Sequence, residues 1–178
     1  MIPIFNTAIA CCISLNMICA CCCSDKNMAD FITLNTPDLD TSFKTYMSYR
    51  SITDIDSEQY AMQRKAWTDE NGLRRYNNDY MIAVGSYYSS ECGDRFKITL
   101  DTGNSFTAVV GDIKDDLHTD DNNMYTPVYD ENGEFISANV IEFIADTKSL
   151  PYKVKLHGSV GAIEDFSGNI ENIERIII

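Results

Sequence analysis

From Tyr80 to the C-terminus the sequence consists of short runs rich in β-branched and aromatic residues, separated by turn signals. The sequence DTGN at 101–104 predicts a hairpin between two such runs, and ENG at 131–133 predicts a second turn. The expected strands are residues 80–84, 96–100, 105–110, 140–144, 154–156 and 169–178. Because no long helical pattern interrupts them, we expect a mainly β fold, in the form of a small closed barrel.

The length and charge of the chain limit its organisation and its partners. It has 178 residues, of which 44% are hydrophobic, and a chain of this size buries roughly 70% of its unfolded surface. One self-sufficient core is therefore expected. The 27 acidic residues outnumber the 14 basic ones and give a formal net charge of −13. Because nucleic-acid binding depends on neutralising phosphates with Lys and Arg, DNA and RNA are not expected as partners.

Residues 1–24 form an uncharged segment that contains six of the seven cysteines. An apolar stretch of about this length serves as a signal peptide or as an uncleaved membrane anchor. The sequence Ile18-Cys19-Ala20-Cys21 is similar to the cleavage box of bacterial lipoproteins, in which the last cysteine takes the lipid. Both alternatives, lipidation at Cys21 and an anchor, predict that the remaining chain is exported to the extracellular side of the cell envelope, in contact with the membrane through this segment.

The spacing of the cysteines and the absence of known catalytic motifs mean that the sequence predicts neither a metal site nor a cofactor site. The adjacent cysteines at 21–23 do not match the C-x-x-C spacing with which two thiolates reach one tetrahedral ion. Residues 25–178 contain only Cys92, so no disulfide is expected there. A thiol–imidazole pair of Cys92 with His118 or His157 is one alternative, but a lone cysteine more often has a packing role. P-loop, HExxH and GxSxG motifs are absent from the sequence.

Residues 25–79 lead from the uncharged segment to the strand-rich region. Residues 25–41 are polar and predict a tether, and the alternation in residues 44–52 predicts an extended segment. A helix is expected to start after Ser57, because Ser followed by Glu and Gln is typical of a helix N-terminus. Trp67, at the end of this helix, is expected to anchor it to the core.

Three blocks of the strand-rich region, taken in order, resemble one known family. The sequence IAVGS followed by GDRFKI, within 82–98, resembles a first block of the form I-A-V-D-P and G-T-K-V-Y-I. FTAVVGD at 106–112 resembles a strand ending in A-x-D-T-G-G, and NVIEFI at 139–144 resembles N-R-I-D-L-F. Residues 80–178 are thus similar to the three-aspartate (3D) domain, found in Gram-positive cell-wall lytic proteins of the stationary-phase survival and resuscitation-promoting type.

The resemblance implies a fold and an activity. The implied fold of residues 80–178 is a six-stranded double-psi β-barrel, preceded by a short helical lead-in. The implied activity is that of a lytic transglycosylase, which cleaves the bond between N-acetylmuramic acid and N-acetylglucosamine in peptidoglycan glycan strands without water. The three aspartates of the family correspond to Gly85, Asp112 and Glu142, so that only Asp112 is unchanged. Asp112 is accordingly the expected general acid/base, and Glu142 the carboxylate that perturbs its pKa.

Further residues near Asp112 are candidates for substrate binding. His118 and Asp120 lie in the acidic segment that follows the strand, and three tyrosines offer faces for stacking on sugar rings. These tyrosines are Tyr87, Tyr88 and Tyr125. The alternatives are a solvated acidic loop, tyrosines that belong to the core, and a Glu142 that faces solvent and pairs with a lysine on a neighbouring strand, such as Lys97.

Two functions of different class follow from these observations. The first is a catalytic one, the cleavage of peptidoglycan by Asp112 and Glu142. The second is a non-catalytic envelope module with the same barrel, which binds glycan or protein and has lost the chemistry together with the first family aspartate. The retained Asp112 favours the enzyme, and Gly85 favours the binding module.

Overall fold

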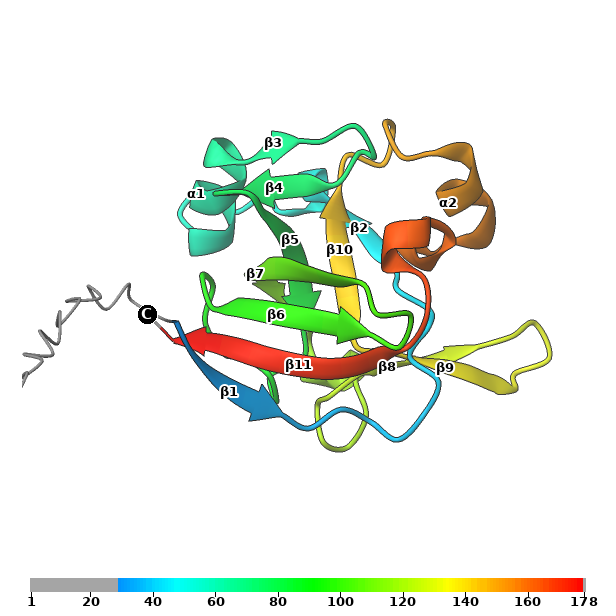
Figure 1. Ribbon diagram of the computed structural model, residues 1–178. Coiled ribbons are helices and arrows are strands. Elements are labelled where there is room, and N and C mark those ends of the chain that lie inside the picture. The colour runs from blue at the N-terminus through cyan, green and yellow to red at the C-terminus, as the bar shows by residue number, and fades with distance from the viewer. Residues whose placement is uncertain (1–28, 178) are drawn as a thin grey trace, which may run out of the picture.

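The runs of β-branched and aromatic residues form strands, as the sequence predicts, and the protein is mainly β (Figure 1). The computed structural model describes residues 29–177, and within them it has eleven strands and two short helices. The helices are α1 (Glu58–Lys65) and α2 (Tyr152–His157). The strands are β1 (Asp30–Leu34), β2 (Tyr46–Ser48), β3 (Trp67–Thr68), β4 (Arg74–Tyr76), β5 (Asp79–Val84), β6 (Arg95–Leu100), β7 (Ser105–Ile113), β8 (Thr126–Tyr129), β9 (Phe135–Asn139), β10 (Ile141–Ala145) and β11 (Ile170–Ile177).

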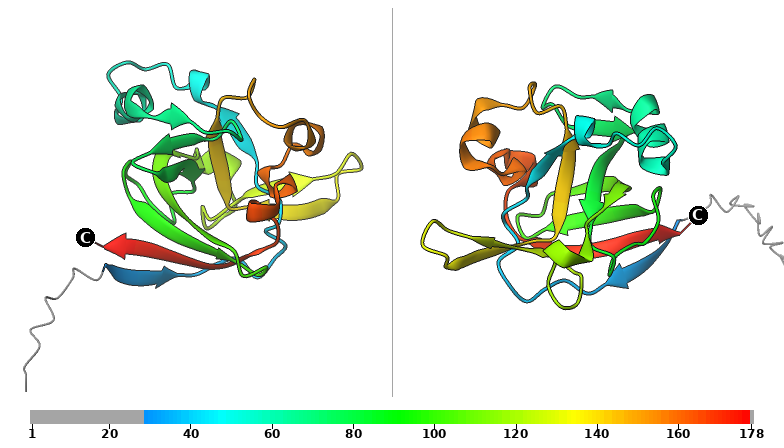
Figure 2. Two further views of the ribbon diagram at one scale, coloured as in Figure 1. Left: turned by 45° about the horizontal axis from the view of Figure 1, so that its top comes forward. Right: turned by 180° about the vertical axis from the view of Figure 1, so that it is seen from behind.

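Within the described residues, nine strands form one mixed sheet and the other two form a hairpin. The main order is β1-β11-β6-β7-β5-β10-β2, β4 pairs with the start of β5, and β3 pairs with β4. The pairs β5/β7 and β2/β10 are parallel, and the other pairs are antiparallel. Figures 1 and 2 show that the sheet is curved, so that β6, β11 and β1 run across the direction of β5 and β10. The β8–β9 hairpin projects from one side.

Strand β7 lies between two strands that precede it in the sequence. It forms an antiparallel hairpin with β6 and a parallel pair with β5, so that the spatial order is β5, β7, β6. A parallel pair needs a crossover connection, which here contains β6 itself. β7 is thus an inner strand of the sheet, hydrogen-bonded along both edges.

The sheet has a main core on one face and a smaller one on the other. The main core includes a cluster of four aromatic rings, those of Tyr80, Phe106, Phe143 and Phe166. In this cluster the Phe143 ring centroid lies 5.0 Å from that of Phe166 and 5.8 Å from that of Phe106. The smaller core consists of Met81, Val109 and Ile144, and it is covered by α1 and by the 3-10 turn η1 (Tyr49–Ser51). Successive residues of β5 and β10 therefore face different cores, as the two-residue period of a strand requires.

Several local expectations differ from the structure. Residues 30–34 form β1 and pair with β11 over their whole length, so this part of the expected tether belongs to the sheet. Residues 154–156 lie in α2 and not in a strand, because Pro151 precedes a helical turn that ends at the left-handed Gly158. Of the segment 44–52, only β2 is a strand, and η1 follows it.

Trp67 is not the core anchor that the sequence predicts. The helix α1 begins after Ser57, whose side chain caps it as expected, but it ends at Lys65. Trp67 therefore lies in β3 and not on the helix, and it is 49% exposed. The expected lipid site Cys21 and the whole uncharged segment lie outside the described residues. Within residues 29–177 no helix is long and apolar enough to span a bilayer.

We expect a Phe143→Ala variant to lose far more stability than a Trp67→Ala variant. Phe143 is completely buried among aromatic rings, and truncating a buried phenylalanine costs about 3–5 kcal/mol. The half-exposed Trp67 ring leaves no closed cavity, so its loss costs about 1 kcal/mol or less. Urea unfolding of the two variants measures this difference, and equal losses would contradict the assigned core.

Candidate functional site

A β-bulge at Gly111 determines where the side chain of Asp112 points. In the parallel pair of β5 and β7, Ile82 lies opposite Val110 but Ala83 lies opposite Asp112, so Gly111 is an additional residue in β7. If Gly111 instead continued the regular pairing, opposite Ala83, the alternation would place Asp112 opposite Val84 and point it into the main core. A Cβ atom on Gly111 would lie 2.7 Å from the Met81 Cε atom, so the smaller core leaves little room for a side chain at the bulge.

The bulge places the two expected carboxylates in one row on the same face of the sheet. Asp112 on β7 lies opposite Ala83 on β5, and Ala83 lies opposite Glu142 on β10. Two strand spacings separate the Cα atoms of the acids by roughly 10 Å. The small Ala83 side chain between them leaves the space above the central strand open. The register thus brings Asp112 and Glu142 to one face of the sheet.

Both carboxylates line an open cleft of about 390 Å³. Its floor is Ala83, and its walls come from β2, β7, β8, β10 and the 3-10 turn η2 (Asp116–His118). The polar wall residues include Asp112, Lys114, His118 and Glu142. Asp112 also lines a neighbouring hollow of about 420 Å³, next to the first residues of α1. We refer to these two spaces as the carboxylate cleft and the α1 hollow.

Burial changes the ionisation of Asp112. Desolvation raises the pKa of its carboxyl above the ordinary value of 3.8. Two hydrogen bonds act in the opposite direction, one from the Ile113 amide at 3.0 Å and one from the Gln59 side chain, but they do not cancel the effect of burial. A carboxyl group in this condition keeps its proton to a higher pH than an exposed aspartate does. The cause is burial, and not the charge of Glu142 that the sequence analysis proposed.

Glu142 faces a lysine that the sequence analysis did not assign to the site. Burial lowers the pKa of Lys114 to about 8, although the nearby charge of Glu142 acts in the opposite direction. The Lys114 Nζ atom donates a hydrogen bond to the Asn139 carbonyl at 2.5 Å. The alternative partner Lys97 is engaged elsewhere, because its Nζ atom lies 3.5 Å from a carboxylate oxygen of Glu174.

The sequence did contain a signal for Lys114, because it follows Asp112 by two residues, and side chains two residues apart in a strand share a face. The Lys114 backbone amide still donates to the Val84 carbonyl at 2.8 Å, so the pairing of β7 with β5 extends beyond the bulge. The Lys114 side chain therefore lies on the same face of the sheet as that of Asp112. The predicted strand ended at residue 110, before the bulge. Asp112 and Lys114 were therefore not recognised as neighbours on one face of the sheet.

Of the other expected binding residues, His118 lines the carboxylate cleft, whereas Asp120 does not. The Asp120 side chain organises its own loop by accepting hydrogen bonds from the backbone amides of Met124 at 2.6 Å and Tyr125 at 2.9 Å. Burial acts to raise the pKa of Asp120, but these hydrogen bonds outweigh it and lower the pKa. Asp120 thus fixes the loop between His118 and β8.

The three expected stacking tyrosines do not line the carboxylate cleft. Tyr88 is 1% exposed, belongs to the main core and donates a hydrogen bond from its hydroxyl to the Asn35 carbonyl at 3.1 Å. Tyr87 is exposed and its ring packs edge-on against Tyr88, with centroids 5.1 Å apart. Tyr125 packs partly buried against the main core. Tyr88 and Tyr125 thus fit the alternative of tyrosines that belong to the core, whereas Tyr87 lies at the surface.

The position of the first family aspartate, Gly85, has no space for a side chain. A Cβ atom there would overlap the carbonyl oxygen of Asn123, which belongs to the backbone and cannot turn away. Gly85 therefore packs directly against the backbone of the loop between η2 and β8. A carboxylate at this position would require a different loop.

Cys92 has the properties of a packing residue and not of a nucleophile. Burial raises the pKa of its thiol to about 11, and the nearby charges of Asp112 and Glu58 act in the same direction. A thiol with this pKa is almost entirely protonated at neutral pH, whereas the thiolate is the reactive form. Within residues 29–177, no group of three His, Cys, Asp or Glu side chains is placed to hold a metal ion.

Comparisons of the chain with protein-family models, with curated proteins and with solved structures give no match.

We expect Asp112→Asn to be at least as stable as the parent protein at pH 7. The pKa of Asp112 is higher in the folded than in the unfolded state, so ionisation of the carboxyl lowers the free energy of unfolding. This loss of stability is present above the folded-state pKa of Asp112. It disappears below 3.8, where the carboxyl is protonated in both the folded and the unfolded protein. Urea unfolding at pH 7 and near pH 3 measures it. A variant that is less stable at pH 7 only would show that the native state favours the carboxylate.

Proposed function

We propose that this protein is an exported cell-envelope protein that cleaves peptidoglycan glycan strands as a lytic transglycosylase. The single observation that carries the proposal is the half-buried carboxyl of Asp112, with its raised pKa, in an open cleft that it shares with Glu142. Catalysis of glycosyl transfer typically uses two carboxyl groups that differ in their environment. Here Asp112 is desolvated, whereas Glu142 lies beside the cation of Lys114.

The proposed reaction requires one proton donor that later accepts the proton back. The protonated carboxyl of Asp112 donates its proton to the glycosidic oxygen while the bond from that oxygen to C1 of the muramic acid residue breaks. The resulting carboxylate then takes the proton from the 6-hydroxyl group of the same residue, whose oxygen forms a bond to C1 and closes the anhydro ring. Glu142 stabilises the positive charge that develops at C1, and His118 contacts the sugar at the cleft wall.

The family fold, a double-psi β-barrel, is part of the proposal. It is supported by the order of the three sequence blocks and by the position of β7 between β5 and β6. The proposed barrel also uses the parallel pair β2/β10, which extends the sheet on the other side of β5.

The proposed location, the outer side of the cell envelope, follows from residues 1–24. Their uncharged sequence and the lipobox-like residues at 18–21 support a membrane contact, with lipid on Cys21 or an uncleaved anchor. Fractionation of the producing cell tests this part of the proposal. Full-length protein found free in the cytoplasm would contradict it.

A non-catalytic envelope module that binds glycan or protein is the second candidate. The observation that favours it is the packing of Gly85, which leaves no room for the first family aspartate. In this case the carboxylate cleft would bind its ligand without cleaving it. The two candidates differ in the products that they leave.

We expect purified protein to release anhydro-muropeptides from peptidoglycan, and Asp112→Asn to lower this rate at least about 100-fold, because a positioned acid/base contributes about 10²–10⁴ to a rate. Glu142→Gln should cause a smaller loss, since the amide keeps its size but not its charge. Mass spectrometry of the soluble products measures both effects.

The matched control is Glu171→Gln, which removes an exposed carboxylate on β11, away from the carboxylate cleft. It should cleave at the parent rate. If the parent binds glycan but releases no anhydro-muropeptides, the binding module is the correct function. If Asp112→Asn cleaves as fast as the parent, another group is the acid.

A further inference from the structure

The carboxylate cleft has one carboxyl group on each side of its floor. Asp112 and Glu142 lie opposite Ala83 on its two neighbouring strands, so all three side chains stand on one face of the sheet. Because Ala83 has only a methyl group, the space between the two acids stays open as part of the cleft. A sugar seated above Ala83 therefore has Asp112 on one side and Glu142 on the other.

The strand spacing separates the two acids too widely for one of them to act as a nucleophile. Side chains in strands stand roughly perpendicular to the sheet, so the two acids stay roughly 10 Å apart, the width of two strand spacings. Glycosidases that form a covalent intermediate hold their carboxyl groups about 5–5.5 Å apart, whereas those that place a water between them need about 6.5–9.5 Å. The cleft is therefore closer to the wider spacing.

The ionisation of Asp112 agrees with a wide separation. Two carboxyl groups in close contact perturb each other strongly. Burial raises the pKa of Asp112, however, and the charge of Glu142 is not among the causes of the shift.

Glu142 lies in a different environment from Asp112. Lys114 is 8% exposed, and its Nζ atom donates a hydrogen bond to the Asn139 carbonyl at 2.5 Å, which fixes the cation at the cleft wall. The charge of Glu142 acts to raise the pKa of Lys114 against the effect of burial, so the two groups attract each other. The Glu142 carboxylate thus has a fixed cation beside it, whereas the Asp112 carboxyl is desolvated. Two acids in such different environments can act as an acid and a base.

The two acids also flank the reacting carbon from opposite sides. In the proposed reaction the anhydro ring forms on the face of the sugar from which the leaving oxygen departs, and Asp112 serves both steps on that face. The other face of the sugar is turned toward Glu142. A water held on that face attacks C1 opposite the leaving oxygen, as in inverting glycosidases.

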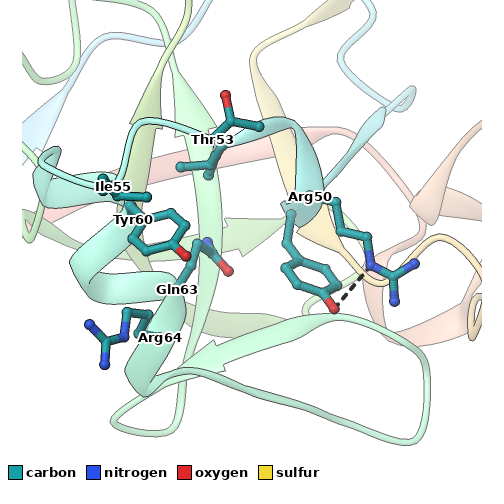
Figure 3. A pocket seen from close by; sticks show the side chains of 8 residues that line it. Arg50, Thr53, Ile55, Tyr60, Gln63 and Arg64 are labelled. Carbon is teal, nitrogen blue, oxygen red and sulfur yellow. Dashed lines mark hydrogen bonds between the residues drawn. The ribbon is translucent and has the colours of Figure 1, made fainter.

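Within residues 29–177, the neighbouring hollows add no carboxylate on a strand. The α1 hollow contains Asp54, which lies in an exposed loop and accepts a hydrogen bond from the Asp56 amide at 3.1 Å. A further hollow of about 450 Å³ opens between η1 and α1, and Figure 3 shows Tyr60 and Arg64 on its helical wall. None of the described residues that line it is acidic. Glu142 is therefore the best-placed base, and Asp54 offers a matched control.

We propose that the carboxylate cleft also hydrolyses the glycan strand, with Glu142 as the base that activates a water. This inference rests on the proposed function. Asp112 donates its proton to the glycosidic oxygen while the bond from that oxygen to C1 breaks. The water oxygen forms a bond to C1, and the proton of the water passes to the Glu142 carboxylate. Because the cleaved link is β, the new reducing end of the muramic acid residue is an α anomer.

The configuration of the first product tests the inference on the unaltered protein. Full-length protein is mixed with peptidoglycan glycan strands, and ¹H NMR records the anomeric proton of the new reducing ends before the two anomers equilibrate. We expect the α anomer to appear first. Reducing ends that appear first as the β anomer would overturn the inference, and so would the release of anhydro ends alone.

Glu142→Gln should lower the release of reducing ends at least about 100-fold, because it removes the base, and should lower that of anhydro ends less. Mass spectrometry separates the two products, since the reducing end is heavier by one water. Asp54→Asn, the matched control, should leave the ratio of the two products unchanged. Reducing ends released by Glu142→Gln at the parent rate, or lost in Asp54→Asn alone, would contradict the role of Glu142.

The two products separate a failure of this inference from a failure of the proposed function. If release that depends on Asp112 gives anhydro ends only, the inference is wrong and the transglycosylase stands. If it gives reducing ends only, and these depend on Glu142, hydrolysis is the activity and the transglycosylase is wrong. If neither product appears, both proposals are wrong.

Discussion

One additional residue in a β-strand determines which face of the sheet carries the carboxyl group of Asp112. The Gly111 bulge reverses the alternation of β7, so Asp112 leaves the face of the main core and joins Ala83 and Glu142 above the smaller one. At that position its carboxyl is buried enough for the pKa to rise and still lines an open cleft. In a regular strand the same carboxyl would have entered the main core, where an isolated charge is very costly.

The segment 41–44, just before β2, is hydrogen-bonded to residues 168 and 169, and these contacts position the β2 wall of the carboxylate cleft. The Thr41 amide donates to Asn169 at 2.8 Å, and the buried Lys44 donates from Nζ to the Gly168 carbonyl at 2.6 Å. Burial lowers the pKa of Lys44 to about 8, so this cation is held by carbonyl groups at some cost in stability. These contacts align β2 with β10 and bring Met47 to the carboxylate cleft.

The sequence predicted the elements that depend on local signals. Alternation and turn residues were sufficient for β5, β6, the first part of β7 and the hairpin at 101–104, and Ser57 was sufficient for the start of α1. The sequence could not predict the bulge, because Gly111 reads as an ordinary strand residue until its partner is known. Trp67 was misjudged, and the choice between stacking and core for Tyr88 stayed open, because exposure depends on contacts between distant segments. Lys114 was missed because the predicted strand ended at residue 110, although Lys114 follows Asp112 by the two-residue period of a strand.

Burial, and not a second carboxylate, raises the pKa of Asp112 beside the open cleft. Carboxyl-selective ¹³C NMR titration of Asp112, in the parent and in Glu142→Gln, measures this pKa. It should lie above the ordinary 3.8 in both proteins, because the Glu142 charge is not the cause of the shift. A pKa at or below 3.8 in the parent, or a raised pKa that returns to 3.8 in Glu142→Gln, would contradict it.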